Sequence, residues 1–156
     1  MLTQFYDDLE TRTENERKKA ISKVLPVQIK NLQSLGGLKG IDSDMIDSVE
    51  ALKQLPVLRK SELREMQQKK PPFGGLVRGT IEHIFQSPGP IYEPGKDTHD
   101  WWRFGRLLHA SGVGRSDIVQ NCFSYHLTPA GMMFENGAKA VGATILPAGT
   151  GQTELQ

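Results

Sequence analysis

At 156 residues the chain has the length of one ordinary domain and can bury a core of its own. Its 19 lysines and arginines nearly balance 18 aspartates and glutamates, which argues against binding to nucleic acid or an anionic membrane through overall charge. The single cysteine excludes an internal disulfide. The first residues are acidic where a signal peptide would be basic, and no apolar run could span a bilayer. We therefore expect a cytoplasmic protein.

The first half of the sequence carries most of the charge and is helical in pattern. Residues 1–78 hold 25 of the 37 charged residues. Thr13 and Glu16 form a capping-box pattern at the start of a helix, which Pro26 should kink or divide. Its apolar residues recur at helical spacing: Ala20, Val24, Val27 and then Leu32 or Leu35.

Two shorter helices are predicted over residues 48–54 and 59–68, separated at Leu55-Pro56, because the residue before proline is steered away from helix. The lysine, proline and glycine run from Lys69 to Gly75 has the composition of a linker. We therefore predict a helical lead-in over residues 1–70 and a second region over residues 79–156.

The second region alternates between strand and helix patterns. Strands are predicted over residues 81–86, 117–124 and 143–147, and helices over 98–112 and 128–142. Trp101, Phe104 and Leu108 should share one face of the first helix, which Gly112 ends. The second helix has Thr128 as N-cap, Pro129 as its first residue and Gly142 as its stop.

This β-α-β-α-β order predicts an α/β fold with a partial parallel sheet. After the third strand, "AGTGQTELQ" reads as a glycine turn in which Thr150 or Thr153 could cap a further helix and in which the amides of "GTGQT" could meet an anion. A plain connection is the alternative. Because a three-stranded parallel sheet leaves its edges and one face uncovered, we expect the chain to be the front part of a larger protein.

The stretch "QSPGPIYEPGK", residues 86–96, follows a predicted strand and resembles a phosphate-binding loop. Ser87, Gly89 and Lys96 are suitable for such a loop, but three prolines each remove an amide that would donate to a phosphate, and Glu93 would repel one. The stretch also lacks the Walker spacing. It is either a rigid proline turn or a degenerate phosphate loop, and the missing amides favour the turn.

The four histidines have neither paired metal spacing nor a neighbouring nucleophile motif, so we assign no metal ligand and no catalytic residue. Tyr125 and His126 stand out because they follow a predicted parallel strand, and ligand crevices form at the carboxyl ends of such strands. They would line an organic-acid pocket. The alternative is a strand-end histidine that is satisfied by local hydrogen bonds.

Several blocks, taken in order, resemble phenylacetate-CoA ligases, members of the adenylate-forming acyl/aryl-CoA ligase superfamily. They are "FYDDLETRTENER", "SVEALKQLPVLRKSELREMQ", "PPFGG" and "WWRFGRLLHASGVGRSDIVQNCFSYHLTPAGMMFENGAKAVGATILPAGTGQTELQ". The resemblance covers nearly the whole chain. It implies the N-terminal portion of an enzyme that uses ATP, magnesium and coenzyme A to convert an aryl or acyl carboxylic acid, through an acyl-adenylate, into a thioester.

Two family motifs fall on this sequence. The family's phosphate loop falls on residues 86–96, where "YEP" replaces its lysine-proline pair and leaves Ser87, Gly89 and Lys96 as degenerate cofactor-binding positions. The family's aromatic motif falls on residues 124–126 and implies that Tyr125 and His126 border the acyl pocket. The family's later motifs, for adenine, ribose and the catalytic lysine, are missing.

We therefore expect this chain alone to be inactive as a ligase. The alternative is a stand-alone, non-catalytic module that binds a partner or self-associates through its exposed sheet edge or apolar face. A degenerate ligase that still binds an acyl or nucleotide ligand is a third hypothesis. In each case we expect a homo-oligomer.

Overall fold

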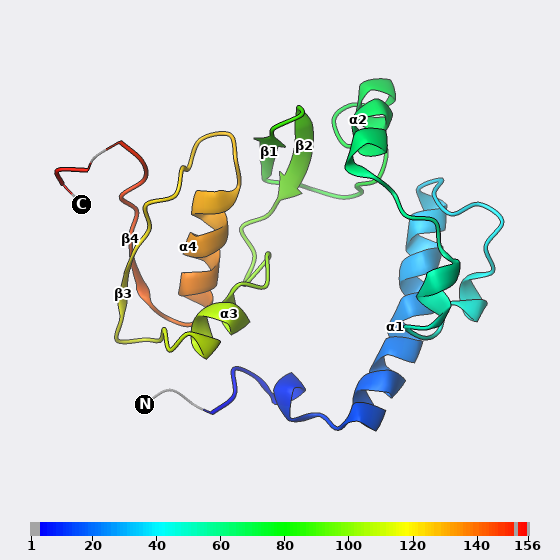
Figure 1. Ribbon diagram of the computed structural model, residues 1–156, viewed down its shortest axis with the longest axis horizontal. Coiled ribbons are helices and arrows are strands. Elements are labelled where there is room, and N and C mark those ends of the chain that lie inside the picture. The colour runs from blue at the N-terminus through cyan, green and yellow to red at the C-terminus, as the bar shows by residue number, and fades with distance from the viewer. Residues whose placement is uncertain (1–3, 152, 156) are drawn as a thin grey trace. The chain divides into compact units, whose positions relative to one another are not determined.

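The computed structural model of the protein describes residues 4–151 and 153–155, and the chain divides into two compact units (Figure 1). One unit is Asp7–Gly79. The other combines the start of the chain, up to Tyr6, with the chain from Thr80 onward. In the described part of the chain, no helix is both long enough and apolar enough to cross a membrane.

The unit Asp7–Gly79 is helical. Its elements are η1 (Asp8–Thr11), α1 (Glu14–Ser34), η2 (Ser43–Met45), η3 (Ala51–Gln54) and α2 (Lys60–Lys69). The capping box predicted for α1 is confirmed, since the Thr13 hydroxyl accepts from the amide of Glu16 at 3.3 Å and the Glu16 carboxylate accepts from the amide of Thr13 at 2.8 Å. This backbone hydrogen bond from Thr13 holds the pKa of Glu16 below its ordinary value.

The core of this unit lies beside the C-terminal half of α1. Ile29, Ile46 and Ala51 are buried together, and the partly buried side chains that pack on them are Leu38, Ile41 and Leu55. The predicted apolar positions Val24 and Val27 are instead more than half exposed and lie outside this core. Helix α1 continues through Pro26, where a kink or division was expected.

The second unit begins with a hairpin rather than with a strand of a parallel sheet. Strand β1 (His83–Ser87) pairs antiparallel with β2 (Ile91–Gly95), and His83 lies opposite Gly95 while Ser87 lies opposite Ile91. This corrects the expectation that 81–86 would join a three-stranded parallel sheet. The second strand was missed because Pro94 within it and Pro88 and Pro90 before it point to a turn, although a proline is tolerated in a strand with an open edge.

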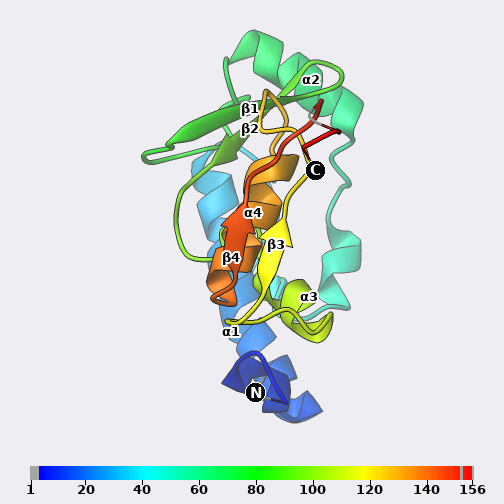
Figure 2. The ribbon, with the colours of Figure 1, turned by 90° about the vertical axis from the view of Figure 1, so that its left-hand side faces the viewer.

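The predicted parallel pairing of the later strands is confirmed. Strand β3 (Ile118–Gln120) pairs parallel with β4 (Thr144–Leu146) in a two-stranded sheet, and α4 (Ala130–Ala140) connects them. Figure 2 shows the two strands side by side across one side of α4. Leu108, Ala138 and Ala143 form the buried core, and the partly buried residues around them include Val119 and Ile145.

The predicted helix ends were only partly right. Gly142 has a φ of +79°, and the amide of Ala143 donates to the carbonyl of Ala138 at 3.0 Å, so the predicted stop of α4 is confirmed. At the other end, Pro129 rather than Thr128 is the N-cap.

Helix α3 (Gly105–Ala110) is shorter than predicted because Asp100 and Arg103 have positive φ angles that a helix cannot contain. Trp101 therefore lies before the helix and is partly exposed, while Phe104 and Leu108 face the core.

Candidate functional site

The carboxyl ends of β3 and β4 meet at one edge of the second unit, the place where parallel sheets form ligand crevices. Asn121 directly follows β3, and its carbonyl accepts from the amide of Gly149, in the segment after β4, at 2.9 Å. Two of the three segments that the sequence marked, the "FSYHLTPAG" loop and the "GTGQT" turn, therefore share this edge. The turn contains no helix over its described residues 148–151, and Gln152 of the predicted anion loop lies outside the described residues.

The predicted phosphate loop reaches the same edge. The backbone amide of Gln86 donates to the carbonyl of Leu127 at 2.8 Å. Because Ser87 follows Gln86 and His126 precedes Leu127, this hydrogen bond places the end of β1 beside the loop that carries Tyr125 and His126. We call this region, residues 121–128 together with Gln86–Gly89, the loop edge.

The buried side chain of Asn121 holds the loop edge in place through its hydrogen bonds. Asn121 is only 4% exposed. The amide nitrogen donates to the carbonyl of Gly131 at 2.7 Å and to the hydroxyl of Tyr125 at 2.8 Å, and the amide oxygen accepts from the N–H of Phe123 at 3.2 Å. A buried polar residue with this many partners fixes the path of the loop.

Tyr125 turns inward, toward the first turns of α4. A Cβ added to Gly131 would lie 2.6 Å from the carbonyl of Ser124 and 2.9 Å from the Tyr125 ring, so this close approach requires glycine. The Tyr125 hydroxyl accepts from Asn121 and donates to Glu135. Burial, with the hydrogen bond to Glu135 and its negative charge, raises the pKa of Tyr125 to about 12.

Glu135 and Lys139 of α4 extend this network. Their ion pair joins residues four apart on the helix, at 2.5 Å. Burial raises the pKa of Glu135, but hydrogen bonds from Lys139 and Tyr125 outweigh it, and the pKa lies below its ordinary value. The hydrogen bond to Glu135 raises the pKa of Lys139, against the opposing effect of burial.

His126 lies in a different environment, because its side chain is exposed on the loop edge. Its backbone is fixed, since its amide donates to the Ser124 hydroxyl at 3.1 Å and the next residue, Leu127, has a φ of +61°. Of the two predicted pocket residues, Tyr125 is therefore held by protein partners and His126 presents its imidazole outward. Asn121, Gly131 and Glu135 were missed by sequence reasoning. The one available signal was a polar residue, Asn121, directly after a parallel strand.

The predicted cofactor-binding residues are not all together. Ser87 ends β1 and its hydroxyl donates to the carbonyl of Ile91 at 3.4 Å, and Gly89, with a φ of +149°, lies in the hairpin turn. Lys96 follows β2 at the opposite end of the hairpin. Two strands of five residues span roughly 13 Å, so Lys96 is too far from the turn for the two to form one small cradle.

Lys96 instead lines a cavity of about 140 Å³ between the hairpin and α4. Its walls also include His83, Trp102, Glu135, Asn136 and Lys139. Two buried side-chain atoms on these walls, His83 Nδ1 and Asn136 Oδ1, have no hydrogen-bond partner within the described part of the chain.

The loop edge lacks the donors and carboxylates that would hold ATP and magnesium. Pro88 and Pro90 flank Gly89 and contribute no amide, so the hairpin turn offers a triphosphate few donors. Glu135, the carboxylate that hydrogen-bonds Tyr125, is already paired with Lys139, and the described residues contain no cluster of three His, Cys, Asp or Glu that could hold a metal ion. These residues alone do not fit a magnesium triphosphate, so no reaction step is assigned to one.

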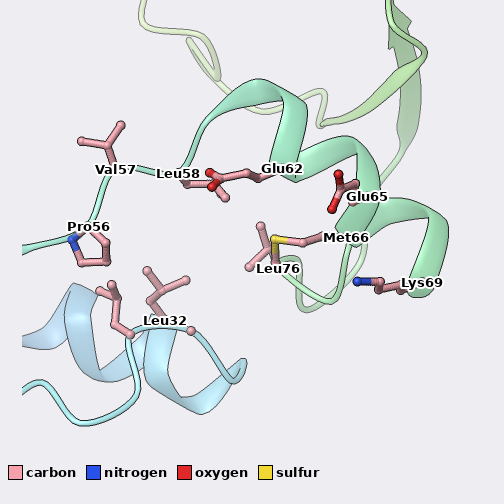
Figure 3. A pocket seen from close by; sticks show the side chains of 11 residues that line it. Leu32, Pro56, Val57, Leu58, Glu62, Glu65, Met66, Lys69 and Leu76 are labelled. Carbon is pink, nitrogen blue, oxygen red and sulfur yellow. The ribbon is translucent and has the colours of Figure 1, made fainter.

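The unit Asp7–Gly79 has a separate, apolar groove of about 430 Å³ (Figure 3). It is lined by Leu32, Leu38, Pro56, Val57, Leu58, Met66 and Leu76, with Glu62, Glu65 and Lys69 on its α2 side. None of the predicted site residues belongs to it.

No protein-family model matches the sequence. Curated proteins similar to it include the phenylacetate-coenzyme A ligase of Aromatoleum evansii, 30% identical over 127 residues, which are 76% of this chain and 28% of that protein. The chain is homologous to part of the phenylacetate-coenzyme A ligases.

The ligases of this name from Thermus thermophilus and Escherichia coli are 29% and 27% identical to it, each over 75% of the chain. The chain spans little more than a quarter of these relatives' length.

Solved structures of CoA ligases share the fold. An open conformation of 2-hydroxyisobutyryl-CoA ligase, in complex with 2-HIB-AMP and CoA, gives a TM-score of 0.78 at 24% identity and covers 90% of this chain and 36% of that one. The same enzyme in its postadenylation state gives a TM-score of 0.77 over 88% of this chain and 32% of that one. The mixed helix and sheet fold predicted from sequence is thus that of part of a CoA ligase, with small sheets.

Proposed function

We propose that this chain forms the acid-binding part of an AMP-forming ligase that joins an aryl or acyl carboxylic acid to coenzyme A. In that reaction the carboxylate attacks the α-phosphorus of ATP and pyrophosphate leaves. The thiolate of coenzyme A then attacks the acyl carbon of the adenylate and AMP leaves. The homology to phenylacetate-coenzyme A ligases supports this reaction class, and the relatives' greater length supports the view that activity needs segments outside these 156 residues.

The observation that carries the proposal is the hydrogen bond from Gln86 to Leu127, because it brings the two family-like motifs to one edge. There Tyr125 and His126 would border the acid, and Ser87 and Gly89 would be what remains of a phosphate loop. The Tyr125 hydroxyl is occupied by Asn121 and Glu135, so its ring supplies an apolar wall. The exposed imidazole of His126 would donate a hydrogen bond to a carboxylate oxygen.

In this proposal Lys96 does not bind a phosphate. It lines the small cavity between the hairpin and α4. The lone, exposed Cys122 fits a reducing compartment such as the cytoplasm.

An NMR titration tests the acid site. We expect phenylacetate to shift the ring resonances of His126 and to leave those of His99 in place, and we expect phenylacetamide, which keeps the ring but lacks the charge, to bind more weakly. The His126→Ala variant should lose the response. Equal shifts at every histidine, or binding that survives His126→Ala, would refute the assignment.

An exchange assay tests the view that the chain needs further segments. We expect no ATP-pyrophosphate exchange above a no-enzyme control with phenylacetate or related acids. Measurable exchange by the purified chain would show that it is complete as an adenylating enzyme and would contradict this part of the proposal.

A second candidate is a binding module that self-associates through its sheet. One specific observation favours it, since Ile118 and Leu146, on the side of the β3–β4 sheet away from α4, are 74% and 50% exposed. Parallel sheets are normally covered on both faces.

A further inference from the structure

The apolar groove of the unit Asp7–Gly79 lies between the C-terminal part of α1 with its following loop and the helix α2, as Figure 3 shows. Leu32 and Leu38 come from the α1 side, and Met66 and Leu76 come from α2 and the segment after it. Its volume of about 430 Å³ is within the range of pockets that bury whole ligands, so it can admit several aliphatic side chains.

Two of the apolar side chains that line the groove are themselves exposed. Val57 is 81% exposed and Leu58 is 51% exposed. A single exposed apolar residue on a surface needs no explanation, but two adjacent ones that continue into an apolar groove form a patch typical of an interaction surface.

Helix α2 borders the groove with one face of the helix. Glu62, Glu65, Met66 and Lys69 stand at i, i+3, i+4 and i+7, and all four line the groove. This stripe of four residues therefore runs from acidic near the start of the helix to basic at its end.

Glu62 accepts from the amide of Arg59 at 2.6 Å, whereas Glu65 and Lys69 of this stripe are not paired with each other in the described part of the chain. Glutamate and lysine stand four residues apart in three helices, and in two of them the ion pair forms: Glu14 with Lys18 at 2.6 Å and Glu135 with Lys139 at 2.5 Å. In α2, no ion pair joins Glu65 to Lys69 among the described residues, and both side chains are exposed.

We propose that a second copy of this chain docks in this groove with its α2 antiparallel to the first. In that orientation Glu65 of each copy faces Lys69 of the other, and the two-fold axis repeats the pair. The exposed Val57 and Leu58, which line the groove of their own copy, pack against the apolar lining of the other copy's groove. The occupant is a second copy because the surface is self-complementary. Its exposed apolar side chains can cover the same apolar surface of another copy, and in the antiparallel orientation Glu65 meets Lys69. This inference is independent of the proposed ligase function.

Sedimentation equilibrium on the full 156-residue chain tests the inference. We expect a concentration-dependent dimer, and we expect Lys69→Glu and Glu65→Lys each to weaken it by about tenfold, because each removes two symmetric pairs and creates repulsion. The double variant E65K/K69E restores opposite charges in the reversed order and should return the dissociation constant to within about threefold of the original. Leu58→Asp should abolish the dimer.

Matched controls separate the interface from general charge effects. Lys18→Glu changes the net charge of the chain by the same amount as Lys69→Glu, but Lys18 lies in α1. This variant should leave the dimer intact. Circular dichroism melts check that each variant folds.

A chain that stays monomeric at high concentration would overturn the inference. So would a double variant that stays as weak as its single parents, or a dimer that ignores the α2 variants and is lost on Ile118→Asp, which would place the interface on the sheet. The acid titration above reads a different unit, so either proposal can fail without the other.

Discussion

The amide of Gln86 donates to the carbonyl of Leu127 over 2.8 Å, and this one backbone hydrogen bond joins the end of the β1–β2 hairpin to the loop after β3. The two residues are 41 positions apart in sequence, and Gln86 lies in β1 whereas Leu127 lies in the loop between β3 and α4. Leu127 offers its carbonyl to the hairpin while holding a φ of +61°, a conformation that side chains with a Cβ rarely adopt. The loop edge thus depends on a strained residue.

This strain predicts the effect of substitutions at Leu127. The side chain is 69% exposed, so its removal loses little burial. We expect Leu127→Gly to be more stable than Leu127→Ala by about 1 kcal/mol, because only glycine adopts this φ without a steric cost. Urea denaturation of the two variants measures the difference. Equal free energies of unfolding would show that the backbone at Leu127 carries no strain.

Short-range signals made parts of this fold predictable. The capping box at Thr13, the stop at Gly142 and the parallel pairing of β3 with β4 each follow from a few neighbouring residues and the β-α-β order. Strand β2 was not predictable in the same way, because Pro90 and Pro94 dominate the local pattern while pairing with β1 decides the structure.

The candidate site was predictable only in part. Tyr125 and His126 were found from their place after a strand, but their opposite environments come from contacts that no local pattern reveals. Glu135 reaches the Tyr125 hydroxyl from the next helix, and Gly131 admits the ring by lacking a side chain. Such contacts are set by tertiary packing.

The close approach of Tyr125 to α4 predicts that Gly131→Ala is destabilising. In an open helical position this change normally stabilises a protein by about 0.5–1 kcal/mol. Here the new Cβ would meet the Ser124 carbonyl at 2.6 Å, a backbone atom that can shift only with the loop, and we expect a net loss of about 1–3 kcal/mol. Urea denaturation measures the free energy of unfolding of Gly131→Ala relative to wild type. A variant more stable than wild type would contradict the close packing of Tyr125 on α4.

The ion pair of α4 predicts an acid-dependent contribution to stability. The pKa of Glu135 is held below its ordinary value in the folded chain, so its stabilising effect is present above the ordinary pKa and is lost as pH falls through the lowered one. Wild type should exceed Glu135→Gln in stability at pH 7, and the difference should vanish in strong acid. Urea midpoints between pH 7 and pH 3 measure it. A difference that stays constant over this range would show that the charge of Glu135 is not what stabilises the fold.

The raised pKa of Tyr125 predicts that the stability of the fold changes at alkaline pH. Its pKa rises to about 12 in the folded chain from an ordinary value of 10.0, so the unfolded chain loses this proton first. The stabilisation is complete below pH 10 and is lost as pH rises toward 12, since over that window only the folded state still binds the proton. Tyr125→Phe removes the hydrogen bonds to Asn121 and Glu135 and should cost about 1–2 kcal/mol at pH 7. The deficit of Tyr125→Phe relative to wild type should shrink between pH 10 and pH 11.5. Parallel pH profiles for wild type and Tyr125→Phe would mean that this hydroxyl titrates as it does in water and that Glu135 does not hold its proton.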